Sequence, residues 1–291
     1  MTLLKNFEIA LDYLEQNLEK PLDIDLLSQL TSIPLQQFEV AFSALFHTNI
    51  DSYFTILKML DCAQKLAFET RVSIEDISHQ AGFGQSMEFE QAFFNAIGQT
   101  VYDFRVKPDW GNFFSRQQPL NTLAKGLNNV QDFSNDIQII EFRSQRLIAI
   151  RHQGEKQYLS QTINALTAWQ EHHHINHQMS RSFHLMKSLD TEPNSNVDVE
   201  ITAVLNDAQY DALTASIAAS EHFYVTTLPK CKMLQLPHRG CDIGLEDKIK
   251  FLYGVYLERE GYQLADIPLV IERCGINQDK KMVSTILLAV N

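Results

Sequence analysis

The sequence predicts a multidomain α and α+β protein, in which an all-α domain precedes a domain of mixed strands and helices. Apolar residues recur at helical spacing through roughly the first hundred residues, and strand-like runs alternate with helical segments from residue 138 onward. Between them lies an irregular stretch rich in Pro, Gly and Asn. A chain of 291 residues is long enough for two cores. We therefore expect domains at 1–107 and 138–291, joined by a linker at 108–137.

The first part of the N-terminal domain predicts a helix-turn-helix, which is two short helices joined by a tight turn. A helical stripe ends before Pro21 and consists of Phe7, Leu11, Leu14 and Leu18. Asp23 is a good N-cap for the next helix. Residues 31–34 then form a turn, and Pro34 marks the start of a third helix.

The same arrangement repeats after a longer helix that starts at Asp51. At Ser73 a helix starts with a sequence like a capping box, in which Asp76 stands where Glu or Gln is usual. Gly82 supplies the turn, and Gly98 ends the following helix. The sequence thus predicts a double helix-turn-helix head bridged by one long helix. In the linker, aromatic residues indicate that part of it packs onto a neighbour: Trp110, Phe113 and Phe114.

The C-terminal domain predicts a duplicated β-α-β-β fold. The first half reads as a strand, a helix and two strands, at 139–152, 158–172, 182–186 and 197–204. The second half reads the same way, at 224–238, 244–260, 269–273 and 282–290. His152 and His238 hold the same place in the two halves, each two residues before a glycine. This duplication points to two modules around a pseudo-twofold axis, with a cleft between them.

Composition and motifs exclude several classes of protein. No apolar run approaches the roughly 18 residues that a membrane span needs, and the N-terminus lacks the features of a signal peptide, so we expect a cytoplasmic protein. The four cysteines form no C-x-x-C pair. His173 and His177 could share a helical face, but no third metal ligand lies nearby. No catalytic motif is present, so we expect no enzyme, no metal and no cofactor.

Most of the net negative charge lies in the helical head. The whole chain has a net charge of −12, and residues 1–107 hold seven Lys and Arg against 15 Asp and Glu. Phosphate contacts supply much of the affinity of any DNA-binding protein. An acidic head is therefore expected to bind DNA weakly, bind it only with a partner, or not bind it.

A set of residues in unbroken register from residue 21 to residue 105 carries a family resemblance. These residues are Pro21-Leu22, Leu27-Ser28, Phe42, Ile74, Ile77-Ser78, Gly82-Phe83, Phe93, Gly98, Thr100-Val101 and Phe104-Arg105. On them the head resembles the AraC/XylS family of bacterial transcription regulators, although His47 stands where the family has glycine. The resemblance implies DNA binding through two recognition helices. An unrelated helical bundle is the alternative.

The resemblance places candidate DNA-binding residues in the two recognition helices. In the first they are Gln36, Gln37, Glu39 and Val40, and in the second Gln85, Ser86, Met87, Glu88 and Gln91. Glutamine can read adenine, and glutamate can accept a hydrogen bond from cytosine. The basic residues usual after these helices are replaced by Ser43, Ala44, Phe94 and Asn95. Glu39, Glu88 and Glu90 repel phosphates, which favours weak binding.

The second half of the C-terminal domain carries another resemblance. The matching segments are His238-Arg-Gly240, Leu252-Tyr253-Gly-Val-Tyr256-Leu257, Gly261-Tyr262, Pro268-Leu-Val-Ile-Glu272 and Ala289-Val290. They resemble the GyrI-like small-molecule-binding domains that accompany AraC-type heads in Rob-like regulators. The resemblance implies a cleft in which Glu272 receives a cationic or amphipathic ligand, with Tyr253, Tyr256 and Trp169 as aromatic walls.

Each of these residues also has a structural interpretation. Tyr253 and Tyr256 lie on an amphipathic helix and could be core residues. Glu272 lies in an alternating strand, where it could face solvent or pair with an arginine.

The sequence therefore predicts a one-component transcription regulator. A small hydrophobic or cationic effector binds the C-terminal domain and changes how the head engages promoter DNA or RNA polymerase. The alternative is an effector-binding sensor or protein-interaction module whose acidic head has weakened or lost DNA binding. A hydrolase that uses the same cleft is a third option.

Overall fold

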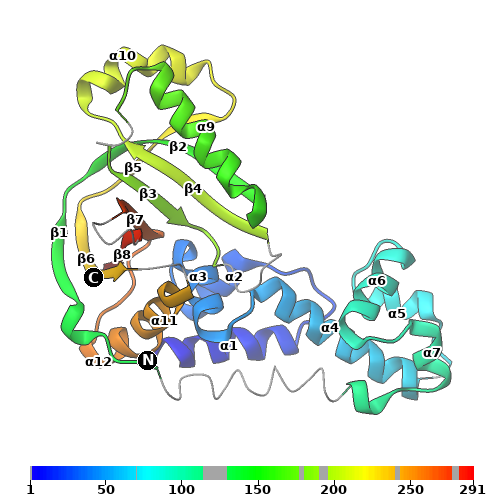
Figure 1. Cartoon of the computed structure of the whole chain (residues 1–291). Coiled ribbons are helices and arrows are strands. Elements are labelled where there is room, and N and C mark those ends of the chain that lie inside the picture. Colours follow the sequence, from blue (N-terminus) through cyan, green and yellow to red (C-terminus); the bar gives the residue numbers. More distant parts are fainter. Residues whose placement is uncertain are drawn as a thin grey trace. The chain divides into compact units, whose positions relative to one another are not determined.

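The computed structural model describes residues 2–69, 71–113, 130–176, 180–189, 196–239, 243–276 and 282–291. The chain divides into two compact units (Figure 1). The helical unit comprises 1–32 and 46–128, and the sheet unit comprises 33–45 and 129–291. A short segment of the expected helical head, residues 33–45, thus groups with the C-terminal region.

Apolar periodicity predicts the described helices of the helical unit except the last, and the first of them ends at Glu15, so Leu18 of the predicted stripe lies outside it. These helices are α1 (Leu3–Glu15), α2 (Ile24–Thr31), α4 (Ile50–Phe68), α5 (Ile74–Gln80), α6 (Ser86–Ile97) and α7 (Val101–Val106). Asp23 and Ser73 are the N-caps of α2 and α5, since their side chains accept backbone N–H groups at 2.9 and 3.0 Å. Gly98 ends α6 in the left-handed conformation, at φ 80°. These local signals fix where the helices begin and end.

The long helix α4 supplies the apolar surface on which the second half of the helical unit is built. Its buried residues form one core with Ile77 of α5, Phe89 and Phe93 of α6, and Phe104 of α7. Trp110 lies 5.6 Å from the ring of Phe104, so the start of the expected linker packs onto this core. Phe113 is buried in the same cluster, whereas Phe114 lies outside the described residues.

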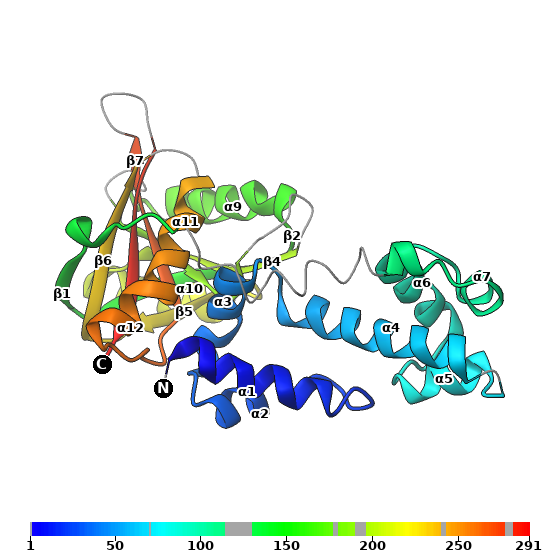
Figure 2. The ribbon, with the colours of Figure 1, turned by 90° about the horizontal axis from the view of Figure 1, so that it is seen from below.

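The sheet unit is built on one eight-stranded antiparallel sheet, curled as Figures 1 and 2 show. The strand order is β1-β6-β8-β7-β3-β4-β2-β5. The strands are β1 (Gln138–Phe142), β2 (Gln145–Glu155), β3 (Ser182–Met186), β4 (Asn196–Val204), β5 (Phe223–Leu228), β6 (Cys231–Arg239), β7 (Leu269–Ile276) and β8 (Met282–Val290). The helices are α3 (Leu35–Phe46, of which all but the last residue belong to this unit), α9 (Leu159–His172), α10 (Asp207–Ala218), α11 (Ile243–Phe251) and α12 (Leu257–Glu260). Shorter elements are the 3₁₀ helices η1 (Ser134–Asp136) and η2 (Lys156–Tyr158) and the π-helix η3 (Leu252–Tyr256).

The order of strands is symmetric about the central pair β3 and β7. On one side lie β4 and β2, and on the other lie β8 and β6, as two β-α-β-β modules require. The prediction of single long strands at 139–152 and 224–238 was wrong. Each is two strands, and the leading strand pairs with the opposite module: β1 with β6, and β5 with β2. Such an exchange depends on pairing between distant segments, which a local pattern does not encode.

Helix α10 was missed in the sequence, although its start carries a signal. Asn206 and Gln209 form a reciprocal capping box. Ile217 is the buried residue of this helix, so the apolar periodicity on which the prediction relied is weak.

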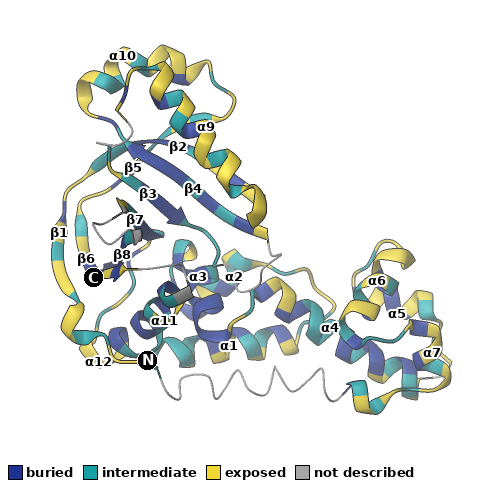
Figure 3. Cartoon of the chain, viewed as in Figure 1, coloured by how far each residue is buried: buried dark blue, intermediate teal, exposed yellow. Residues whose placement is uncertain are grey.

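The two faces of the sheet carry different cores. Helices α9 and α10 cover one face of the first module, where Leu166 and Ile217 pack on Ile148 and Ile201 (Figure 1). The other face holds a second cluster that includes Phe183, Leu185, Val270 and Leu287. Figure 3 shows β4 largely buried and the outer surfaces of α9 and α10 largely exposed. The second face carries the charged residues of the candidate site.

Candidate functional site

Glu272 lies on the sheet face opposite to α9. It is paired in register with Phe183, so both side chains point to the same face. Arg181 donates to both oxygens of Glu272, Nε to Oε1 at 2.6 Å and Nη2 to Oε2 at 3.1 Å. This bidentate hydrogen bonding raises the pKa of the Arg181 guanidinium. The carboxylate predicted to receive a cationic ligand is thus already paired with a cation of its own chain.

The surroundings of this ion pair combine an aromatic ring with restricted access. The Arg181 guanidinium lies 4.9 Å from the centroid of the Phe183 ring. The Glu272 side chain is 13% exposed, whereas Arg181 is 49% exposed. The carboxylate is therefore sheltered, and the arginine covers it from the solvent side. Arg181 was not singled out in the sequence, although a shielded glutamate requires a nearby positive charge.

A second group of charges shares this face of the sheet. Glu200 is paired with Leu185 and with Arg151 in register, which places it on the Glu272 face. Lys187 lies 3.4 Å from Glu200, and Arg151 donates to Asp198 at 2.8 Å. Burial, followed by the charge of Glu200, raises the pKa of Tyr224 to about 12. In this group, too, each carboxylate has a basic partner.

The predicted aromatic residues Tyr253 and Tyr256 both belong to the π-helix η3. Tyr253 is 1% exposed, and its hydroxyl donates to Oε1 of Gln37 in α3. Burial raises the pKa of Tyr253 well above its usual value. Tyr256 stacks on Tyr262 at 6.5 Å, and the guanidinium of Arg259 lies 5.4 Å from its centroid.

Trp169 lies on the other face of the sheet. It projects from α9 into the core that includes Ile148, where its ring is 5.4 Å from Phe223 and 4.5 Å from His173. The four predicted ligand residues therefore have separate sets of partners. The structure brings Glu272 together with Arg181 and Phe183, and it places Trp169 across the sheet.

The predicted second recognition helix, α6, presents its candidate residues to solvent. Gln85, Ser86, Met87, Glu88 and Gln91 are all exposed, and Met87 is 80% exposed. Gln91 donates to Asn95 at 2.9 Å, one turn along the same helix. This surface is available to a partner, but Glu88 and Glu90 make it acidic.

The predicted first recognition helix, α3, is placed differently. Gln37 and Val40 are 0% exposed, and Gln36 and Glu39 are half-buried. Gln36 accepts a hydrogen bond from Lys187 at 2.9 Å. The amide side chain of Gln37 contacts Tyr253 and the backbone carbonyl of Ile267. Gln36 and Gln37 thus bond other residues of the sheet unit.

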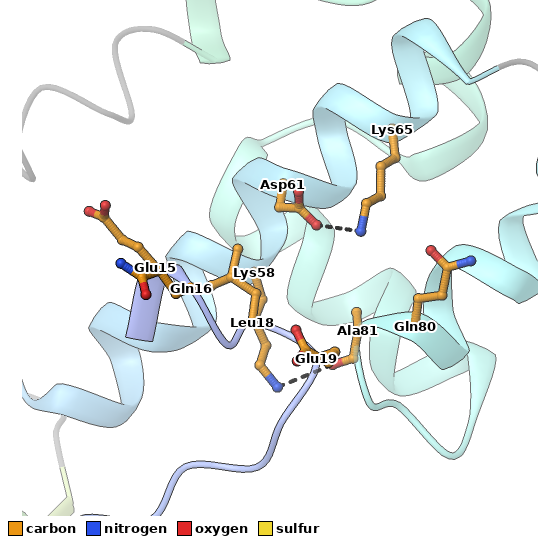
Figure 4. Close-up of a pocket in the computed structure, with 9 residues that line it drawn as sticks. All are labelled: Glu15, Gln16, Leu18, Glu19, Lys58, Asp61, Lys65, Gln80 and Ala81. Atoms are coloured by element: carbon orange, nitrogen blue, oxygen red, sulfur yellow. Dashed lines mark hydrogen bonds and ion pairs between the residues drawn. The ribbon is translucent and has the colours of Figure 1, made fainter. Parts of the chain in front are cut away.

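A polar pocket of 340 Å³ lies within the helical unit (Figure 4). Its lining residues are Glu15, Gln16, Leu18, Glu19, Lys58, Asp61, Lys65, Gln80 and Ala81. Lys58 donates to the backbone carbonyls of Lys20 and Ala81 at 3.0 and 3.2 Å, and Lys65 pairs with Asp61 at 2.8 Å. Desolvation lowers the pKa of Lys58. Because both lysines are engaged within the unit, we assign this pocket a structural role.

Within the described ranges, no cluster of His, Cys, Asp and Glu side chains could hold a metal ion. Of the two histidines weighed as ligands, His173 packs on Trp169, and His177 lies outside the described residues. Among the helices that the structure describes, none is long and apolar enough to cross a membrane.

Comparison with known proteins identifies the C-terminal region. The model of the GyrI-like small molecule binding domain matches residues 135–288. Solved structures that match include the EcmrR C-terminal domain, with 17% identity over 53% of this chain and 96% of that chain, at a TM-score of 0.42. EcmrR in a complex with DNA is 13% identical over 70% of this chain and 82% of that chain, at a TM-score of 0.42. A transcriptional regulator with an AraC-type DNA-binding domain, from Chromobacterium violaceum, is 24% identical over 36% of this chain and 94% of that chain, at a TM-score of 0.35.

All three structures match with TM-scores below 0.5. The family match stands independently of them and covers more than half of the chain. The chain belongs to the GyrI-like family, with a GyrI-like small molecule binding domain in its C-terminal region.

Proposed function

We propose that this chain is a transcription regulator whose GyrI-like domain binds a small amphipathic or cationic effector at Glu272. The observation that carries the proposal is the sheltered carboxylate of Glu272, held by an exposed arginine beside the ring of Phe183. A ligand cation can replace the guanidinium at the carboxylate. The ring then supplies cation–π attraction, and the apolar cluster around Phe183 and Val270 contacts the rest of the ligand.

The test is a titration with tetraphenylphosphonium, a lipophilic cation, in which isothermal calorimetry measures the affinity. Glu272→Gln removes the negative charge and keeps the shape, so affinity should fall by about tenfold. The matched control is Glu258→Gln, which changes an exposed carboxylate on α12 of the same unit. Equal affinities for wild type and Glu272→Gln would contradict binding at this carboxylate.

The DNA-binding part of the proposal rests on the AraC-type pattern of the helical region and on the exposed surface of α6. RNA polymerase is a further partner that such a regulator can engage. We expect weak binding to promoter fragments, because few phosphates are neutralised by an acidic head. A gel-shift series at about 50 mM salt, where phosphate contacts are strong, tests this expectation.

One observation favours a second candidate function. On α6, the exposed Glu88 and the half-buried Glu90 disfavour contact with phosphates. In this second candidate function, the chain is a ligand sensor or protein-interaction module. Failure to shift any fragment at low salt would select this candidate. Neither candidate function includes a catalytic role.

A further inference from the structure

Helix α3 is buried almost completely. Between Gln37 and Phe46 every residue except Glu39 is buried (Figure 3). A recognition helix must present side chains to the major groove. In this arrangement the buried side chains of α3 are closed to such a contact.

Gln37 forms the centre of the contact. Its side chain is 0% exposed, and both polar atoms of its side-chain amide form hydrogen bonds within the sheet unit. Oε1 accepts from the hydroxyl of Tyr253, and Nε2 donates to the carbonyl of Ile267. The hydroxyl of Tyr253 is itself buried, so each group satisfies the other. Such a reciprocal pair fixes how α3 sits, because rotating the helix would leave two buried polar groups without partners.

The N-terminus of α3 is held by a second set of bonds. The backbone N–H of Gln36 donates to Oδ1 of Asp266 at 3.2 Å, so a carboxylate from another element caps the first turn. Nζ of Lys187 donates to Oε1 of Gln36 at 2.9 Å and lies 3.4 Å from Glu200 on the ligand-facing side of the sheet. Lys187 therefore links α3 to the charged face that holds Glu272.

The π-helix η3 sets the position of Tyr253. A π-helix widens one turn between α11 and α12, and such interruptions occur often at functional sites. The widened turn carries the Tyr253 hydroxyl that bonds Gln37.

We propose that α3 is an internal ligand of the GyrI-like domain, docked through Gln36 and Gln37, and that docking and DNA reading by these side chains exclude each other. The second clause rests on the proposed function, because it supposes that the head reads DNA. The docking itself is independent of DNA. The structure shows the docked form, in which the two glutamines bond Tyr253, Ile267 and Lys187.

Hydrogen exchange of the full-length protein, read by mass spectrometry, tests the docking. Tyr253→Phe removes the hydroxyl and keeps the ring, so the amides of residues 37–46 should exchange about tenfold faster, as expected for the loss of one buried hydrogen bond. Strands β2 and β4 should keep their wild-type rates. The matched control is Tyr262→Phe, which removes a tyrosine hydroxyl elsewhere in the sheet unit and should leave α3 unchanged.

A second variant acts from the surface and does not risk the core. Asp266→Ala removes the cap of α3 from an exposed position and should also speed exchange of α3. If α3 in wild type exchanges as fast as the exposed face of α6, or if neither variant changes it, the docking proposal is overturned.

A DNA gel-shift series with the same proteins separates the two proposals. Tighter binding by Tyr253→Phe than by wild type supports mutual exclusion, and binding that is equal in both overturns it. Faster exchange of α3 without DNA binding by any of the proteins supports the docking and counts against the DNA-binding part of the proposed function.

Discussion

Replacing Arg181 by glutamine should strengthen the binding of a lipophilic cation. In the wild-type protein, a cation reaches Glu272 only by displacing a bidentate guanidinium, whose bonds measure 2.6 and 3.1 Å. A charge-assisted bidentate pair is worth up to about 3 kcal/mol when it is shielded. Arg181 is 49% exposed, so solvent screening reduces this to about 1 kcal/mol. The Kd for tetraphenylphosphonium should therefore fall by about fivefold in Arg181→Gln.

Isothermal calorimetry of Arg181→Gln, Glu272→Gln and the double variant checks this reasoning. The single variants should move the Kd in opposite directions, and the double variant should bind the cation more tightly than Glu272→Gln, because it also lacks the guanidinium that occupies the Phe183 ring and repels a cation. Triphenylphosphine oxide, a neutral compound of similar shape, should bind all forms alike. A weaker or unchanged affinity for the cation in Arg181→Gln would refute the idea that the ligand replaces the guanidinium.

Three further predictions concern stability and charge. Lys58→Met should lower the free energy of unfolding of the helical unit by about 1–2 kcal/mol, because Lys58 donates to two backbone carbonyls and lies 4.6 Å from the centroid of the Phe54 ring. Denaturant unfolding measures this loss, with the exposed Lys5→Met as the control. Burial raises the pKa of Tyr224 in the folded state from 10.0 to about 12, so its contribution is complete below pH 10 and is lost as the pH rises towards 12. Unfolding at several pH values should show this decline, and Tyr224→Phe should reduce it. Replacing both Glu88 and Glu90 by lysine should tighten DNA binding at low salt and steepen its salt dependence, whereas an unchanged gel shift would exclude α6 from the DNA contact.

The sequence determined the local elements of this protein well. Asp23, Ser73 and Gly98 mark helix ends because capping depends on side chains within one turn. Strand β3 lies where strand propensity and alternation predict it. The residues of its strand that resemble the GyrI-like family also single out Glu272 as a candidate ligand residue.

The partners of these residues were decided by the tertiary structure alone. Arg181 is 91 residues away from Glu272 in the sequence, and the two meet because β3 and β7 pair at the centre of the sheet. The amide of Gln37 can bond a base or a buried tyrosine equally well, so its residue type is consistent with either role. Burial against Tyr253 gives it the second role in this structure, because a buried amide must find its partners within the protein.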